Sequence, residues 1–345
     1  MRIAFVLPGR GRSGGVRVTV KMCNELLRLG HEVRLLWRRP PSRLRSWIKS
    51  AIQRASGGEN TDWLGEFTGE AEPYQDLSDL AFEPDEIVIA VGAMTVKDVY
   101  DLQAPVIKVR YNHGFSTYRP DLMKSAWSVP MTTLAVAATL VPELEQFSGQ
   151  RVHAVVPNGI EADQYYDMGL KRDGIGMMFS THPNKCPQDA LAALRKAHQR
   201  WPDVPQYVFG PAKRPQEIPK DSYWRYPSVA RARELYNRAK VWLMTSKDEG
   251  FGLPSLEAMA CGAAVVSTDN LGSAEIIQHG VNGFLVPIGD TDQMMKWVQL
   301  LLTDESKRKS IAEQGYQTAK AFSWENAVRK MEQALAGLKG QARTT

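Results

Sequence analysis

Short apolar runs alternate with helical segments along the first half of the chain. The runs predict buried strands at residues 2–7, 31–37, 86–91, 105–111 and 133–137. Between the first two strands, apolar residues recur at helical spacing from Val16 and stop at Gly30, a residue that often ends helices. The order strand, glycine loop, helix, strand is the beginning of a doubly wound α/β sheet.

The second half of the chain repeats this alternation. Strands are predicted at 175–180, 206–210 and 241–244, and helices at 188–200, 230–239, 253–261, 290–302, 305–322 and 324–338. Residues 56–83 are rich in glycine and acids and are expected to form a loop, and the tail after Gly340 is expected to fray. A chain of 345 residues can bury two cores. We therefore predict domains at 1–157 and 158–322, followed by a helix and tail at 323–345.

One stretch of the second half, Ser246 to Gly262, has the composition of a ligand-binding loop. It reads SKDEGFGLPSLEAMACG and follows the apolar run 241–244. Pro254 suits the first turn of a helix, and Gly262 suits the position after its end. Free amides and the positive end of the helix dipole favour an anion there, and glycines lacking Cβ let a ligand approach the backbone. The predicted ligand-binding residues of this loop are Gly250, Phe251, Gly252 and Leu253.

Two carboxylates, Glu249 and Glu257, bracket this loop with seven residues between them. If a phosphate lies at the helix start, Glu257 lies near the group that is attached to the phosphate. A ribose is one such group, because its hydroxyls can donate hydrogen bonds to a carboxylate. Glu249, on the loop side, can reach a second polyol or a developing charge. A plainer alternative stays open, in which Glu257 only complements the helix dipole and Glu249 is a solvated loop acid.

The whole stretch resembles the E-x7-E signature of the retaining glycosyltransferases of the GT4 family, which have the GT-B fold. The resemblance continues in two downstream blocks, 273–277 (SAEII) and 280–286 (GVNGFLV), and in one upstream block, 156–160 (VPNGI). It covers about residues 150–300, and the N-terminal half matches only in layout. The resemblance implies two Rossmann-like doubly wound domains that face a central cleft, with the last helix crossing back to the first domain. The first domain would bind the acceptor and the second the nucleotide sugar.

The resemblance also implies roles for residues outside the loop. Lys185 matches the lysine that binds the donor diphosphate, whereas the family's arginine shortly before it is absent. His182 stands in that neighbourhood and is our donor-binding candidate there, and Cys186 replaces the family's glycine. Gly14 and Gly15 match a glycine loop that faces donor phosphate and acceptor.

His113 follows the strand 105–111 in a polar stretch, at the strand end where open α/β sheets bind ligands. It is expected to bond a sugar hydroxyl or an acceptor, and the resemblance implies support of the donor sugar. A loop histidine bonded to backbone is the alternative.

The reaction implied by the resemblance is transfer of a sugar from a nucleoside-diphosphate sugar to an acceptor hydroxyl, with retention of configuration. Glu249 would contact the transferred sugar, Glu257 the ribose, and Lys185 with the loop amides the leaving diphosphate. The predicted active-site residues are thus Glu249, His113 and Lys185, with no metal and no further cofactor. A UDP-sugar is the default donor. The acceptor is expected to be a cell-envelope glycan, a lipid or a small metabolite, as in polysaccharide or glycolipid synthesis.

A second motif supports a rival function. Gly9, Gly11 and Gly14 spell G-x-G-x-x-G after a strand and before a helix, which is the dinucleotide fingerprint. The usual ribose-binding acid after the second strand is replaced by Arg38 and Arg39, which suit a 2′-phosphate. An NADP-dependent oxidoreductase is therefore an alternative. A non-catalytic nucleotide-sugar-binding protein, an epimerase and a sugar phosphorylase are others.

The net charge of +5 is the difference between two opposed segments. Residues 1–54 carry 13 Lys and Arg against two acids, and residues 55–101 carry 12 acids against one lysine. The basic face suggests an anionic partner, either a phosphorylated substrate or a membrane, and no nucleic acid is predicted. Residues 43–54 form a basic amphipathic segment that either lies on an anionic membrane or packs on its own domain.

The expected location is the cytoplasm, either free or at the inner membrane face. No apolar run approaches the length of a membrane span. The three cysteines, Cys23, Cys186 and Cys261, are far apart in sequence and lack metal-like spacing. Cys23 and Cys261 are expected to be buried thiols in a reducing compartment.

Overall fold

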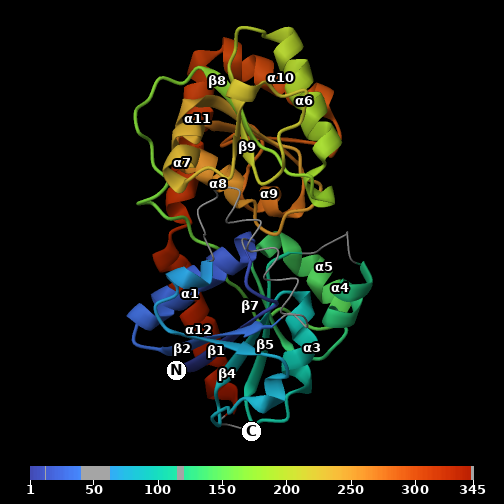
Figure 1. The fold of residues 1–345 in the computed structure, drawn as a ribbon, viewed down its shortest axis with the longest axis vertical. Coiled ribbons are helices and arrows are strands. Elements are labelled where there is room, and N and C mark those ends of the chain that lie inside the picture. The colour runs from blue at the N-terminus through green and yellow to red at the C-terminus, as the bar shows by residue number, and fades with distance from the viewer. Residues whose placement is uncertain (12, 40–62, 115–119, 343–345) are drawn as a thin grey trace. The chain divides into compact units, whose positions relative to one another are not determined.

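The computed structural model describes residues 1–11, 13–39, 63–114 and 120–342, which form two α/β units (Figure 1). The first unit contains the chain up to Gly159 and the C-terminal helix that begins at Trp324. The second unit is Ile160–Ser323. The last helix thus returns to the first unit, as the resemblance implied.

The described part of the first unit is built on a seven-stranded parallel sheet. The strand order is β3-β2-β1-β4-β5-β6-β7, which is the doubly wound arrangement. The strands are β1 (Arg2–Leu7), β2 (Glu32–Arg38), β3 (Glu70–Tyr74), β4 (Ile87–Val91), β5 (Ile107–Asn112), β6 (Thr132–Ala135) and β7 (Ala154–Val155). The central strands β1 and β4 are almost entirely buried, because helices cover both faces of a parallel sheet.

Helices cover the two faces of this sheet in separate groups (Figure 1). One face carries α1 (Gly14–Arg28) and α12 (Trp324–Ala342), and the other carries α3 (Ala93–Asp101), α4 (Pro120–Trp127) and α5 (Val141–Ser148). The hydroxyl of Ser13 caps α1 by accepting from the amide of Val16. His31 links the end of the α1–β2 connection to α12, because its Nε2 lies 3.0 Å from the Glu332 carboxylate.

The second unit repeats the same strand order on a six-stranded parallel sheet, β10-β9-β8-β11-β12-β13. Its strands are β8 (Gly174–Met178), β9 (Gln206–Gly210), β10 (Tyr223–Arg225), β11 (Ala239–Met244), β12 (Ala264–Thr268) and β13 (Phe284–Val286). Helices α6 (Pro187–Arg200) and α10 (Thr291–Thr303) pack on one face, and α7 (Val229–Arg238) and α8 (Leu253–Ala260) on the other. Two further helices are α9 (Leu271–Ile276) and α11 (Glu305–Ala321). The predicted pair of doubly wound domains is confirmed.

One loop prediction is wrong, and several strands were not predicted. Strands β12 and β13 lie after residue 262, where no strand was specified. Residues 70–74, expected in a loop, form β3, and residues 223–225 form β10, which was not predicted. Both are edge strands defined by pairing with a single neighbour, so their sequences need no apolar alternation, and Pro73 is typical of an edge. The last helix does not fray at Gly340 but continues to Ala342.

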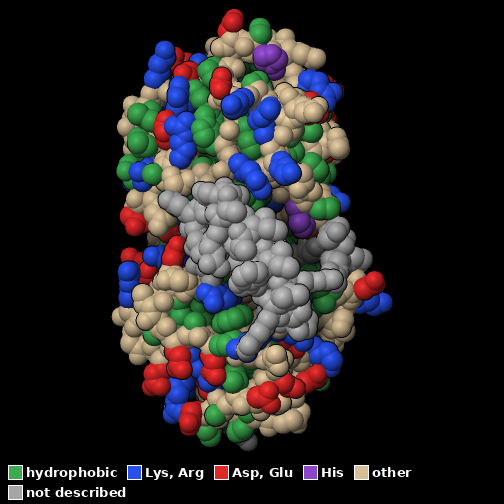
Figure 2. Space-filling model, viewed as in Figure 1, with side chains coloured by type: hydrophobic (Ala, Val, Ile, Leu, Met, Phe, Trp, Pro, Cys, Tyr) green, Lys and Arg blue, Asp and Glu red, His purple; other side chains and the backbone are tan. Residues whose placement is uncertain are grey.

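The surface charge and the cysteines can be compared with the sequence predictions. The predicted basic segment 1–54 belongs to the first unit, and its residues 12 and 40–54 lie outside the described residues. Figure 2 shows Lys and Arg side chains gathered on the visible face of the second unit (top), and Asp and Glu side chains along the lower edge of the first. Cys23 and Cys261 are buried free thiols, as predicted. Within the described segments, none of the helices combines the length and apolarity that crossing a membrane requires.

Gly159 fixes the position where α12 joins the first unit. A Cβ at this residue would lie 2.6 Å from the backbone N and Cα of Trp324, the first residue of α12. We expect Gly159→Ala to destabilise the first unit by about 2 kcal/mol, because backbone atoms cannot move aside as a flexible side chain can. For a unit of this size its melting temperature should fall by roughly 4–8 °C.

A matched control is Gly65→Ala, since a Cβ at Gly65 meets nothing within 4 Å. Differential scanning calorimetry compares the two variants with the wild type. Melting of Gly159→Ala within one degree of Gly65→Ala would contradict this packing role.

Candidate active site

The loop between β11 and α8 has the predicted strand–loop–helix geometry. Gly252 is the N-cap of α8 with φ +83°, a left-handed conformation that favours glycine. No side chain caps this helix among the described residues, and Pro254 lies in its first turn. Gly262 follows the helix with φ +78°, as a glycine after a helix end commonly does. The N-terminus of α8 therefore presents uncapped positive potential beside Glu249–Gly252.

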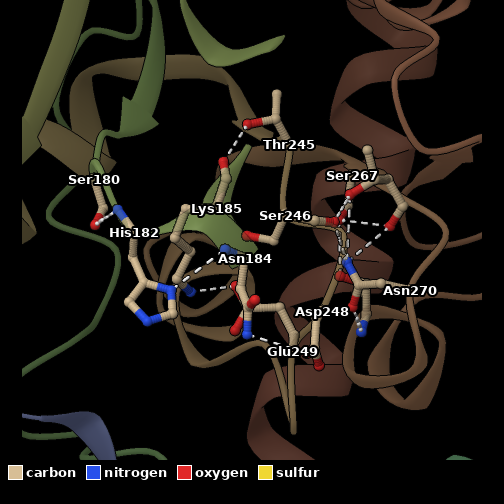
Figure 3. Close-up of polar contacts among 12 residues, drawn as sticks. Ser180, His182, Asn184, Lys185, Thr245, Ser246, Asp248, Glu249, Ser267 and Asn270 are labelled. Carbon is tan, nitrogen blue, oxygen red and sulfur yellow. Dashed lines mark hydrogen bonds and ion pairs between the residues drawn. The ribbon is translucent and has the colours of Figure 1, made fainter. Parts of the chain in front are cut away.

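An ion pair joins the two central predicted residues, Lys185 and Glu249 (Figure 3). Lys185 belongs to a 3-10 turn, η4 (Pro183–Lys185), which leads from β8 into α6. The Nζ of Lys185 donates a hydrogen bond to Oε1 of Glu249. The two side chains are only 23% and 11% exposed, so water screens the pair less than a surface ion pair. The lysine and the glutamate that the resemblance placed at one site are thus in direct contact.

Further hydrogen bonds hold η4 against the loop (Figure 3). The amide of Lys247 donates to the carbonyl of Asn184 at 2.9 Å, and Asn184 Nδ2 donates to Asp248 Oδ2 at 3.1 Å. The hydroxyl of Thr245 donates to the carbonyl of Lys185 at 3.2 Å. Backbone and side-chain contacts therefore fix both partners of the ion pair relative to each other.

Residues at and just after the end of β12 support the loop from its other side, and the sequence patterns did not assign them to the site. The carbonyl of Ser246 accepts from the hydroxyl of Thr268 and from Asn270 Nδ2, the latter at 3.0 Å. The Asn270 side chain also caps α9 by accepting from the amide of Ser273 at 2.9 Å. A Cβ at Gly272 would lie 2.6 Å from the Glu249 carbonyl, so only glycine allows this close approach. The sequence signal for this support is Asn270, because Asn is a common helix N-cap residue.

Glu257 points into the unit and not into solvent. It is 9% exposed, and its Oε2 accepts a hydrogen bond of 2.8 Å from the hydroxyl of Tyr236. Burial and the neighbouring Glu257 carboxylate raise the pKa of Tyr236 well above its usual range, so Tyr236 remains a donor. The Tyr236 ring packs on Trp242 with ring centroids 4.3 Å apart, and Gly176 leaves the space that Trp242 fills. A buried aromatic group therefore sets the orientation of Glu257.

The positions that depart from the family pattern keep a defined geometry. Cys186, in place of a glycine, has φ 47° and ψ 63°, so the backbone retains the left-handed conformation that a glycine adopts easily. The exposed His182 caps η4, because its Nδ1 accepts from the amide of Asn184 at 3.3 Å. In the neutral ring the hydrogen is consequently on Nε2. Burial raises the pKa of the Cys186 thiol, which does not suit a nucleophile.

The remaining candidates, Gly14, Gly15 and His113, belong to the first unit. Gly14 and Gly15 form the first turn of α1. The ring of His113, just after β5, packs on Tyr111 with centroids 4.2 Å apart. Its Nε2 is buried without a hydrogen-bond partner among the residues that the structure describes. Burial lowers the pKa of His113 to about 4, so the ring is neutral near pH 7.

The lowered pKa of His113 predicts a pH-dependent stability. Between about pH 4 and 6.5 the unfolded chain binds a proton at this residue that the native protein excludes, so stability falls as the pH falls. From pH 7 to pH 5 the loss attributable to His113 should be about 1–2 kcal/mol. Denaturant unfolding of the wild type and of His113→Gln at both pH values measures it.

The matched control for this titration is His198→Gln, which removes an exposed histidine of α6. His198→Gln should keep the wild-type difference between pH 7 and pH 5, and His113→Gln should lose most of it. Equal differences in all three proteins would show that His113 is not buried in its neutral form.

Sequence comparisons match the second unit to known proteins. The model of the family "Glycosyl transferases group 1" matches residues 224–318. The D-inositol 3-phosphate glycosyltransferase of Corynebacterium urealyticum is 30% identical over 181 residues, which are 48% of this chain and 43% of that protein. The phosphatidyl-myo-inositol mannosyltransferase of Mycolicibacterium smegmatis is 26% identical over 185 residues, 49% of this chain and 48% of that protein. The chain spans less than half the length of these curated relatives.

Solved structures match nearly the whole chain in fold. A crystal structure of S. aureus TarM with UDP superposes with a TM-score of 0.76 at 9% identity and covers 97% of this chain and 100% of that one. Anabaena HepE in complex with UDP and glucose gives a TM-score of 0.75 at 16% identity and covers 98% and 100%. At these identities the likeness concerns the fold. Residues 224–318, which include the loop and α8, are therefore similar to the group 1 glycosyl transferases, and the two-sheet architecture is the GT-B fold.

Proposed function

We propose that this chain is a retaining, metal-independent glycosyltransferase of the GT4 type, which moves a sugar from a nucleoside-diphosphate sugar to an acceptor hydroxyl. The observation that carries the proposal is the Lys185–Glu249 pair beside the N-terminus of α8. It brings together a cation, a helix N-terminus and a carboxylate from two different strand ends. Those groups suit a diphosphate attached to a polyol.

The diphosphate is the leaving group and gains negative charge as the glycosidic bond breaks. Lys185 and the first-turn amides of α8 stabilise this charge, and they are already held in place before the reaction. His182 extends the positive edge of the site with its Nε2–H, at the place where the family has an arginine. Stabilisation by fixed donors requires no metal ion in this mechanism.

The two carboxylates recognise the polyol parts of the donor. Glu249 accepts hydrogen bonds from the hydroxyls of the transferred sugar. Glu257 accepts hydrogen bonds from the ribose hydroxyls in addition to the one from Tyr236. The departing phosphate takes the acceptor proton, so attack occurs on the face that the leaving group vacates. Retention of configuration follows from that geometry.

The first unit supplies the acceptor side in this proposal. His113 is neutral, so its buried Nε2 offers a directional hydrogen bond to a sugar or acceptor hydroxyl without attracting a second proton. Gly14 and Gly15 give close access to the backbone at the start of α1. A Cβ at Gly14 would meet nothing within 4 Å, which leaves space at this position.

The names of related proteins support the substrate class. UDP accompanies both TarM and HepE in their structures, and HepE also holds glucose, which favours a UDP-sugar donor here. The curated relatives act on inositol phosphate or phosphatidylinositol by name, which agrees with a small or lipid-linked acceptor in envelope glycan synthesis. We propose a cytoplasmic enzyme. The basic segment 43–54, for which membrane contact and packing on its own domain were the two alternatives, lies outside the described residues.

The oxidoreductase alternative has no support from the comparisons, which match glycosyltransferases. A non-catalytic nucleotide-sugar-binding protein is the alternative that an activity assay excludes. Transfer or slow hydrolysis of a labelled UDP-, GDP-, ADP- or dTDP-sugar by the wild type would exclude it. Binding of one of these donors without any turnover would support it and contradict the proposal.

Glu249→Ala should reduce transfer at least 100-fold, because the sugar loses the carboxylate that orients it. That factor corresponds to about 2.7 kcal/mol of transition-state stabilisation. The control Asp292→Asn removes an exposed carboxylate of α10 in the same unit and should keep the wild-type rate. Initial rates of transfer with the labelled donor are compared for the wild type and the two variants. Wild-type turnover by Glu249→Ala would refute the assigned role.

Tyr236→Phe tests the assigned role of Glu257. Loss of the hydroxyl removes the 2.8 Å hydrogen bond to the buried Glu257 carboxylate. The KM for the nucleotide sugar should therefore rise by roughly 3–10-fold, with little change in kcat. The control Tyr223→Phe removes a hydroxyl that donates to a backbone carbonyl, that of Ala212, at 2.7 Å in the same unit. A KM that rises equally in both variants would indicate a general loss of stability and not a contact to the ribose.

A further inference from the structure

The Lys185–Glu249 pair joins two groups that the proposed function assigns to different parts of the donor. Lys185 is to bind the diphosphate and Glu249 the sugar, yet without ligand each is the other's partner. The pairing should therefore affect how tightly the site binds the sugar donor and the nucleoside diphosphate product. This inference rests on the proposed function and extends it.

Both partners are held where they meet, so the pair is not a chance contact of long surface side chains. Thr268 and Asn270 fix the carbonyl of Ser246, and Gly272 packs on the backbone at Glu249. Thr245 fixes the carbonyl of Lys185. Both backbones are therefore fixed, and both side chains are mostly buried where they meet.

A diphosphate that approaches Lys185 meets the Glu249 carboxylate on the same ammonium group. Two anions that share one partly buried cation repel each other, because little water screens them. The diphosphate must therefore either displace the carboxylate or bind beside it at a cost. The carboxylate recovers this loss only if it finds new hydrogen-bond donors, and the hydroxyls of a bound sugar are such donors.

We infer that Glu249 competes with the nucleoside diphosphate for Lys185, and that this competition distinguishes the donor from the product. With the intact donor, the sugar hydroxyls occupy Glu249 and leave Lys185 to the diphosphate. After transfer the sugar is gone, Glu249 returns to Lys185, and the nucleoside diphosphate is bound less tightly. The ion pair thereby favours product release, in addition to the contact that Glu249 makes with the sugar.

A neighbouring carboxylate provides a matched control. Asp248 lies in the same loop, next to Glu249, and its Oδ2 accepts a hydrogen bond from Asn184. Asp248→Asn removes one negative charge from the loop, and its amide oxygen can still accept the hydrogen bond from Asn184 Nδ2, so the position of η4 and the Lys185–Glu249 pair are kept. Glu249→Gln removes the same charge at nearly constant shape and releases Lys185.

The test is isothermal titration of the whole protein at 0.15 M salt with UDP, GDP, ADP and dTDP, followed by the matching sugar-linked donor. Glu249→Gln should bind the nucleoside diphosphate about tenfold more tightly than the wild type, and the donor no more tightly. The ratio of product to donor dissociation constants should therefore fall about tenfold in this variant and stay within twofold of the wild type in Asp248→Asn. Lys185→Met should weaken binding of both ligands.

Each contrary outcome has a distinct meaning. If the wild type binds a nucleoside diphosphate but Glu249→Gln binds it equally or more weakly, the competition is refuted and the proposed transferase remains. If Asp248→Asn tightens binding as much as Glu249→Gln, the effect belongs to the charge of the loop and not to the pair. If neither the wild type nor Glu249→Gln binds any of these ligands, both the inference and the proposed function are overturned.

Discussion

The carbonyl oxygen of Ser246 is the point on which the site depends. It accepts hydrogen bonds from Thr268 and Asn270, which lie at and just beyond the end of the next strand of the sheet. These bonds tie the end of β11 to the end of β12, so the loop that carries Glu249 begins at a fixed place. Gly272 then allows the loop backbone to approach α9 closely. Ligand-binding residues at the carboxyl ends of parallel strands are positioned here by contacts between neighbouring strand ends.

The same constraint explains why few charged residues suffice. Lys185 and Glu249 come from different strand ends, yet η4 and the loop are joined by both backbone and side-chain hydrogen bonds. Because Lys185 is already held in place, a diphosphate that binds it does not have to order the lysine, and the cost that remains is the displacement of Glu249. The family's arginine is absent, and we propose that His182 and Lys185, at the start and end of one short turn, supply donors in its place. Cys186 has a left-handed backbone conformation, so this position keeps the conformation typical of glycine although the residue is a cysteine.

Sequence patterns predicted the framework because its signals are local. Apolar runs marked the central strands other than β12, and Gly252, Pro254 and Gly262 marked the two ends of α8. The edge strands β3 and β10 were missed because pairing with a neighbour defines them, and no local signal reports that pairing. For the same reason, Thr268 and the Tyr236–Glu257 bond could not be predicted, since 21 residues separate Tyr236 from Glu257. The Lys185–Glu249 pair was predicted only as two residues of one site, not as a contact.

The diphosphate of the donor is proposed to bind at the N-terminus of α8 and not at that of α1. A crystal structure of the protein soaked with the nucleoside diphosphate that binds it locates this group directly. We predict phosphate density beside the amides of Gly252 and Leu253, within hydrogen-bond distance of Lys185 Nζ, with Glu249 released. Phosphate density at Ser13–Gly15, where α1 begins after the glycine loop, with the Lys185–Glu249 pair intact, would contradict this placement of the donor.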